Sequence, residues 1–210
     1  MANQTQRTDT ALHNKSHLMQ YHDLIESIVA AMDARDAYTA KHSDRVADMV
    51  LVLASALSLS GDETTLLHMA AHLHDIGKIA VPDSVLRKAG PLTNPEWEEM
   101  RRHPVTGYEI LRKVDDFKEI AVLVRHHHER WDGRGYPDGL RGADIPLGSR
   151  ILAVADSIDA MMSSRSYRPA MTSAACRREI ERNSGIMYDP CVAAAALEHW
   201  DELVSRYAEA

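Results

Sequence analysis

Side chains that can bind metal ions are spread along the whole sequence. The candidate ligands are His42, His74, Asp75, His103, His127, His128 and Asp156. Imidazoles with a few carboxylates and no thiolate suit iron or manganese, while zinc is less favoured. A histidine beside an aspartate in a helical bundle can also be a polar pair that hydrogen bonds alone satisfy. Because the candidates come from five separate helices or helix ends, their spacing alone leaves both interpretations open.

The pair His74-Asp75 stands at the end of an apolar-periodic run that predicts a helix buried on one face. A neutral imidazole and a carboxylate are costly to bury there without partners, and metal coordination is one way to satisfy them. Gly77 is predicted to end this helix. Lys78 then suits the negative end of the helix dipole.

Other histidines of this region are less suited to a shared site. His68 and His72 lie on other sides of the predicted helix than His74, so we interpret them as structural or exposed. The run from His126 to His128 cannot face one way on a helix, because neighbouring side chains diverge by about 100°. At most two of these three imidazoles are therefore expected to converge.

The remaining candidates lie on other predicted helices. His42 lies near the start of an apolar helix, one turn before Val46, and should point inward. A proline after His103 places that imidazole at a helix junction. Asp156 and Asp159 lie one turn apart in a strongly apolar helix, where buried carboxylates call for a cation. Arg45 is interpreted as a surface or helix-dipole charge.

The elements that carry these residues are all predicted to be helical. Apolar periodicity indicates helices near residues 24–32, 46–57, 60–75, 93–103, 151–162, 172–184 and 190–207. Ser60 with Glu63 and Thr93 with Glu96 have the spacing of capping boxes. No strand alternation of useful length is found, so the predicted fold is all-α. Residues 1–20 are polar and predicted to form a flexible N-terminal tail, and residues 21–210 are predicted to form one domain.

Composition limits the possible partners and compartments. The net charge of −7 argues against a general DNA-binding role but permits a small anionic ligand in a local positive cleft. Two cysteines, Cys176 and Cys191, are too few for a disulfide framework. No apolar run approaches about 18 residues and the N-terminus lacks a signal-peptide core, so we expect a cytoplasmic location without a membrane span.

Six sequence blocks between about residues 36 and 192 resemble the HD-GYP subgroup of the HD-domain metal phosphohydrolases. They are YTAKHSDRV, HLHDIGKIAVPD, HPVTGYEIL, HHERWDGRGYPDGL, IPLGSRILAVADSIDA and RSYRPA. The resemblance implies an HD-domain helical bundle with an HD-GYP loop and extra C-terminal helices. It also implies a cyclic di-GMP phosphodiesterase that yields pGpG, GMP or both, through attack of a metal-bridging hydroxide.

The resemblance also implies roles for individual residues. His42, His74, Asp75 and Asp156 would hold one metal, while His103, His127 and His128 would hold a second, with Asp75 bridging. His126 lies outside the matching histidine pair and is not expected to be a ligand.

Three basic residues match phosphate-contacting positions of the family: Lys78, Arg165 and Arg168. Asp75 and Lys78 are the residues expected to act in catalysis. Some relatives have a glutamate that helps to hold a third metal where this chain has Tyr38, and a phenol is a poor ligand at neutral pH. We therefore predict two metal ions, iron or manganese before zinc.

Two alternatives to hydrolysis of cyclic di-GMP stay open. The chain could hydrolyse another cyclic dinucleotide, such as cyclic GMP-AMP, or could act as a nucleotide sensor or protein-interaction module without turnover. By analogy with the family, the GYP loop could contact a diguanylate cyclase or another regulatory protein, and the chain could form a homodimer. Trp131 and Tyr136 could stack on guanine or serve in packing.

Overall fold

The computed structural model describes residues 21–35, 41–164 and 169–207. The predicted tail over residues 1–20 lies outside these ranges, as do Tyr38, Arg165 and Arg168. The expectations that concern them therefore stay predictions.

The described chain is built from helices joined by short connections. In chain order they are α2 (His22–Arg35), α3 (His42–Ala56), α4 (Gly61–Leu73), η1 (Ile76–Ala80), α5 (Asp83–Leu86), α6 (Asn94–Met100), α7 (His103–Leu111), η2 (Asp115–Phe117), α8 (Lys118–His126), η3 (Gly142–Asp144), α9 (Leu147–Met162), α10 (Ser173–Arg182), α11 (Pro190–Glu198), α12 (Trp200–Leu203) and η4 (Ser205–Tyr207). Short 3-10 helices are labelled η.

The predicted all-α fold is confirmed, since the described residues contain no strand. Both predicted capping boxes are present, at the start of α4 and at the start of α6. The single helix expected over residues 190–207 was wrong, because the chain leaves α11 at His199 and continues as α12 and η4. None of the described helices has the length and apolar character needed to cross a bilayer.

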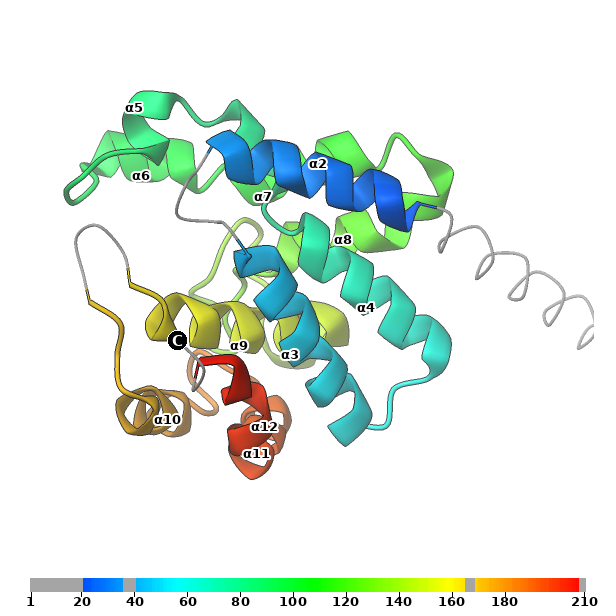
Figure 1. The fold of residues 1–210 in the computed structure, drawn as a ribbon, viewed down its shortest axis with the longest axis vertical. Coiled ribbons are helices and arrows are strands. Elements are labelled where there is room, and N and C mark those ends of the chain that lie inside the picture. The colour runs from blue at the N-terminus through cyan, green and yellow to red at the C-terminus, as the bar shows by residue number, and fades with distance from the viewer. Residues whose placement is uncertain (1–20, 36–40, 165–168, 208–210) are drawn as a thin grey trace, which may run out of the picture.

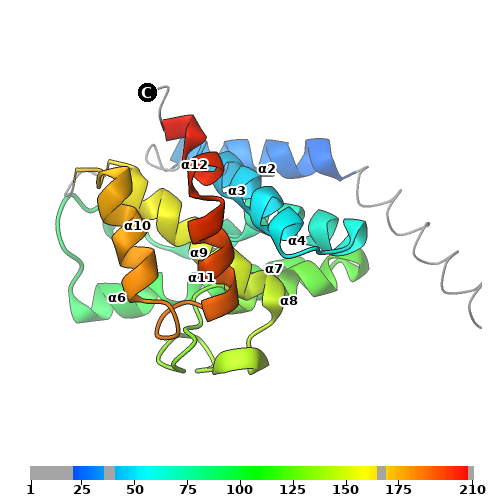
Figure 2. The same ribbon diagram turned by 90° about the horizontal axis from the view of Figure 1, so that it is seen from below.

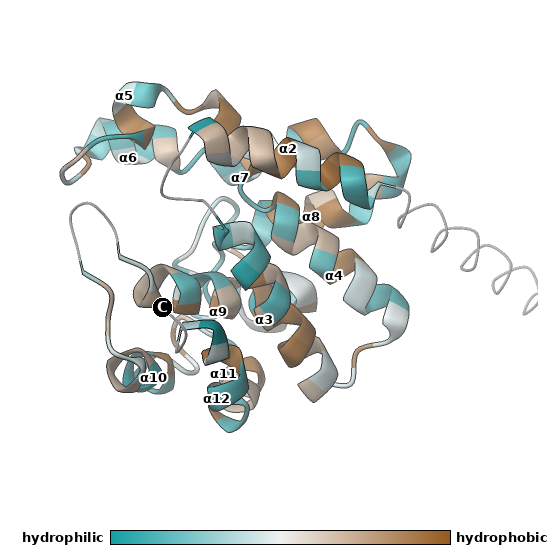
Figure 3. Cartoon of the chain, in the orientation of Figure 1, coloured by the Kyte–Doolittle hydropathy of each residue, from teal (hydrophilic) through white to brown (hydrophobic). Residues whose placement is uncertain are grey.

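The helices form two groups on either side of α3, α4 and α9 (Figure 1). Helices α10, α11 and α12 gather at one side, while α2, α7 and α8 lie at the other. In the view from below, α10 and α11 lie in front (Figure 2). Hydrophobic and hydrophilic residues alternate around the helices (Figure 3), as expected where one face of each helix is buried.

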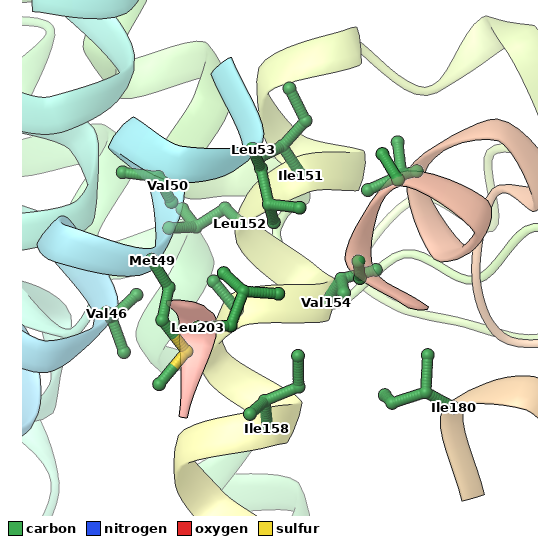
Figure 4. Packing of buried hydrophobic residues seen from close by; sticks show 14 of the residues in the cluster. Val46, Met49, Val50, Leu53, Ile151, Leu152, Val154, Ile158, Ile180 and Leu203 are labelled. Atoms are coloured by element: carbon green, nitrogen blue, oxygen red, sulfur yellow. The ribbon is translucent and has the colours of Figure 1, made fainter. Parts of the chain in front are cut away.

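Two hydrophobic clusters correspond to these two groups. The first joins α3 and α9 to the C-terminal helices through residues such as Leu53, Ile151 and Ile180, all of which are fully buried (Figure 4). The second joins α2, α4, α7 and α8. Burying one such side chain contributes about 1.5–3 kcal/mol to the stability of the fold. The two clusters therefore fix the positions of the helices that they join.

Candidate metal centre

The predicted ligands lie on five helices or helix ends. His42 begins α3, His74 and Asp75 follow α4, His103 begins α7, His127 and His128 follow α8, and Asp156 lies within α9. His74, His103 and His127 are almost completely buried. The fold therefore brings together all seven candidates in two neighbouring groups.

The first group contains His42, His74, Asp75 and Asp156. The Nε2 atoms of His42 and His74 are 3.2 Å apart. Asp75 Oδ2 lies 3.4 Å from His74 Nε2 and 3.8 Å from His42 Nε2. Asp156 Oδ1 approaches the same two nitrogens, at 3.5 Å from His42 and 4.0 Å from His74. Two imidazoles and two carboxylates thus converge on one small volume.

The second group contains His103, His127 and His128, each of which offers a ligand atom within 4.8 Å of the other two. The Nε2 atoms of His103 and His127 are 3.3 Å apart. Asp75 links the groups, because its Oδ1 lies 3.4 Å from His103 Nε2 while its Oδ2 faces His74. Its carboxylate therefore has the position expected of a bridging ligand.

The local backbone sets the tautomer of three of these imidazoles. His74 Nδ1 donates to Ala71 O at 2.7 Å, His103 Nδ1 to Met100 O at 2.8 Å, and His127 Nδ1 to Val124 O at 2.6 Å; each acceptor is three residues upstream. A nitrogen that donates in this way leaves Nε2 without a proton and available as a ligand.

His103 and His127 show why this arrangement fits a cation. Burial lowers the pKa of His103 to about 3 and holds the pKa of His127 well below its ordinary value, so both rings are neutral at pH 7. With both Nδ1 protons used, two Nε2 lone pairs face each other and cannot form a hydrogen bond. A divalent cation held between them would satisfy both, and the donor set therefore fits a metal ion.

Asp75 is held in its charged form. Burial alone would raise the pKa of its carboxyl, but Lys78 and the imidazoles of His74, His103 and His42 hold that pKa well below its ordinary value. Lys78 Nζ donates to Asp75 Oδ2 at 2.6 Å. The predicted site residue Lys78 therefore lies at the centre, beside the carboxylate that links both groups.

Asp159 has a different role from the one its position in an apolar helix suggests. His42 Nδ1 donates to Asp159 Oδ2 at 2.6 Å, and Arg45 donates to both carboxylate oxygens. Tyr207 also donates to this carboxylate. The predicted cation partner of Asp159 is therefore a guanidinium group, and the interpretation of Arg45 as a surface charge was wrong.

This contact extends the site beyond the residues that the sequence indicated. A carboxylate behind a ligating histidine fixes the orientation of the ring and raises its basicity. Asp159 and Arg45 orient His42 in this way, with Tyr207 supplied from the C-terminal end of the described chain. The one available signal was the second carboxylate in α9, since nothing local indicates that Arg45 or Tyr207 would meet it.

The residues after α8 divide between the site and the loop that follows. His126 turns away, as expected, with its Nε2 3.0 Å from Asp138 Oδ2. Glu129 is buried, and its Oε1 accepts from the backbone N–H groups of Asp138 at 2.7 Å and Gly139 at 3.0 Å. This glutamate therefore anchors the far end of the loop.

The two aromatic residues of the loop are in packing contacts. The Tyr136 ring stacks on the His128 ring at a centroid distance of 4.9 Å, and the Arg150 guanidinium lies 5.8 Å from the centre of the Trp131 ring. The loop thus covers one ligand of the second group with an aromatic ring. Tyr136 lies closer to the candidate metal ligands than the sequence could indicate.

His68 and His72 lie outside the candidate metal centre, as predicted. Their rings contact each other at 4.8 Å, and His72 Nδ1 lies 3.7 Å from Asp44 Oδ1. His72 is buried and His68 partly exposed, which agrees with a structural interpretation.

Metal-free protein is expected to lose stability as the pH falls from about 6.5 to about 4. Burial lowers the pKa of His128 to about 4 and that of His103 to about 3. In this window the unfolded chain binds protons at these positions and the folded protein does not. The unfolding free energy then falls by up to about 1.4 kcal/mol per pH unit for each histidine.

One imidazole acts in the opposite direction. Burial lowers the pKa of His42, but the hydrogen bond with Asp159 and the charge of Asp156 together raise it by more than burial lowers it. The net shift of this pKa is therefore upward. Its protonation offsets part of the loss caused by the buried neutral histidines. Urea midpoints of metal-free protein at about pH 7.5, 6 and 5 measure the balance. A midpoint that rises towards pH 5 would contradict the expected sign.

Comparison with known proteins shows the family to which the chain is similar. Residues 22–192 match the model of the HD domain family. The chain is 43% identical over 173 residues to the cyclic di-GMP phosphodiesterase response regulator RpfG of Xanthomonas campestris, covering 81% of this chain and 46% of that protein. It is 40% identical over 188 residues to 3′3′-cGAMP-specific phosphodiesterase 2 of Vibrio cholerae, covering 87% of this chain and 35% of that protein.

A solved structure supports the fold. The HDG"Y"P protein Bd1817 of Bdellovibrio bacteriovorus aligns with a TM-score of 0.65 at 16% sequence identity, covering 90% of this chain and 63% of that one. The present chain spans less than half the length of the two curated relatives named above. The chain therefore belongs to the HD-domain family, and the resemblance to HD-GYP proteins that its motifs predicted is confirmed.

Proposed function

We propose that this chain is a metal-dependent phosphodiesterase that hydrolyses cyclic di-GMP. The observation that carries the proposal is the convergence of the seven predicted ligands in two groups that Asp75 links. The names of curated relatives that are about 40% identical supply the substrate class.

Two divalent ions, iron or manganese before zinc, are the proposed cofactors. His42, His74, Asp75 and Asp156 would hold one, and His103, His127 and His128 the other, with Asp75 shared. Bound in this way, such ions supply Lewis acidity towards the phosphate and a nucleophile at neutral pH. The histidine tautomers fixed by backbone carbonyls support this assignment.

The chain's own residues would place the substrate. Lys78 carries a positive charge beside Asp75 and is proposed to bind a phosphate oxygen of the substrate. Arg165 and Arg168 are proposed to bind phosphate as well, because two guanidinium groups can each form paired hydrogen bonds with its oxygens. Asp75 would hold the two halves of the centre in register during turnover.

Cyclic GMP-AMP is the second candidate substrate. A relative named for that nucleotide matches as much of the chain as a relative named for cyclic di-GMP does. The alternative that involves no hydrolysis is a nucleotide sensor. Against it, each described ligand position has a histidine or aspartate that could bind a metal. The proposal also includes a cytoplasmic location and formation of a homodimer. It further includes binding of a regulatory protein, such as a diguanylate cyclase, to the GYP loop.

The deciding experiment combines turnover with metal analysis on one sample. Protein purified anaerobically is incubated with cyclic di-GMP and with cyclic GMP-AMP, and the products are separated by chromatography. We expect pGpG or GMP, together with about two equivalents of iron or manganese. Bound metal and tight nucleotide binding without any product would replace the phosphodiesterase proposal with the sensor.

A further inference from the structure

Helix α6 places an aromatic side chain at the surface without burying any of its own residues. Trp97 is 46% exposed, which is unusual for the largest apolar side chain. Arg101 directly follows the helix, and its guanidinium lies 5.9 Å from the centre of the Trp97 ring. We call Trp97 and Arg101 together the α6 platform.

The α6 platform is connected to the candidate metal centre by ring contacts. The Arg101 guanidinium also lies 5.5 Å from the centre of the Tyr136 ring. Tyr136 in turn stacks on His128 at 4.9 Å, with an angle of 30° between the ring planes. Burial and the negative charges of Asp156 and Asp75 raise the pKa of Tyr136, so its phenol lies within the field of the centre. The platform is therefore at the edge of the site.

Arg101 has hydrogen-bond donors to offer a ligand. Its side chain is 52% exposed, and the nearest carboxylate oxygen, from Glu98, is 3.9 Å away. No side-chain hydrogen bond of Arg101 is found within the described residues. The neighbouring Arg102 differs, because its guanidinium lies 3.2 Å from Glu99.

We propose that the α6 platform binds a guanine base of the substrate, with Trp97 stacking on the base and Arg101 donating to its O6 and N7 atoms. The ring contacts connect the α6 platform to His128. A base bound on the platform could therefore lie beside the candidate metal centre while the attached phosphate reaches the metal ligands. Stacking on an exposed indole tolerates any base, whereas paired donation from arginine selects guanine. Adenine presents an amino donor in place of O6 and would oppose a donor-only guanidinium.

The inference rests on the proposed function and adds a source of base preference to it. Cyclic di-GMP satisfies the platform in either orientation, because both of its bases are guanine. Cyclic GMP-AMP satisfies it in one orientation, and cyclic di-AMP in none. The expected order of kcat/KM is therefore cyclic di-GMP, then cyclic GMP-AMP, then cyclic di-AMP.

The test is the ratio of kcat/KM for cyclic di-GMP to that for cyclic di-AMP. We expect Arg101→Ala to lower this ratio about 10- to 100-fold, mainly through KM for cyclic di-GMP. Trp97→Ala should raise KM for both nucleotides about 10-fold and leave the ratio unchanged. Arg102→Ala, which removes a neighbouring arginine of the same charge, should change neither quantity.

If Arg101→Ala lowers kcat/KM equally for both nucleotides, so that their ratio does not change, the proposal is overturned. If the wild-type protein hydrolyses neither nucleotide, the proposed function fails, and the base site is then tested by equilibrium binding. A Kd for cyclic di-GMP that weakens about 10- to 100-fold in Arg101→Ala, but not in Arg102→Ala, would support the site. Equal affinities of the wild-type protein and Arg101→Ala would refute it.

Discussion

Asp75→Asn is expected to lower kcat/KM for cyclic di-GMP by about 10³-fold or more. The ligands of the metal centre act as a unit, so the loss of one of them removes most of the catalytic effect of the whole set. The Asp75 oxygens face His74 Nε2 and His103 Nε2, each at 3.4 Å. An amide has nearly the same shape but lacks the charge, and its NH₂ group cannot act as a metal ligand. The bound metal should fall below two equivalents in the same sample.

Asp115→Asn is the matched control. Its side chain is 91% exposed and pairs with Lys118 at 2.7 Å, so it is not one of the buried ligand groups. The control should retain wild-type turnover and metal content, since exposed ion pairs contribute little. Full activity in Asp75→Asn with two bound metals would refute the bridging role of this carboxylate.

Gly77→Ala is expected to destabilise the protein by about 3 kcal/mol, the upper range for overpacking a buried contact. A Cβ atom at this position would lie 1.9 Å from His103 O and 2.6 Å from Gly107 N. Both contacts are backbone atoms of α7, so the helix that carries His103 would have to move. Urea unfolding measures the loss, and metal content should fall with it.

The control for this change is Gly90→Ala. A Cβ atom there meets nothing within 4 Å, so the substitution should change stability by less than about 1 kcal/mol. A wild-type urea midpoint for Gly77→Ala would show that η1 and α7 can separate without cost. It would also remove the argument that their close contact positions His103.

The role of Gly77 illustrates what local sequence rules miss. The sequence predicts a glycine that ends the helix, but α4 ends at Leu73 and Gly77 lies inside η1, where its φ is not positive. The glycine is needed because two backbones meet there. Whether another backbone passes close by depends on packing between elements far apart in sequence, which no local pattern records.

The helices and the identity of the candidate ligands could be read from the sequence alone. Apolar periodicity and capping boxes act within one or two turns, so they predict α4 and α6 without knowledge of the rest of the fold. The break at His199 escaped this reasoning, because the chain there turns to pack Trp200 and Leu203 into the C-terminal cluster. Tertiary packing overrode the local helical pattern.

The candidate site likewise has features that the sequence predicted and features that only packing decided. Residue types and the family resemblance predicted which imidazoles and carboxylates would meet, since each ligand occupies a recognisable block. The tertiary structure decided what stands behind them: Asp159 with Arg45 and Tyr207 around His42, and Tyr136 over His128. Those contacts join residues 48 to 117 positions apart or link a loop to a helix end. Their formation depends on how whole helices pack, which a periodicity of 3.6 residues cannot encode.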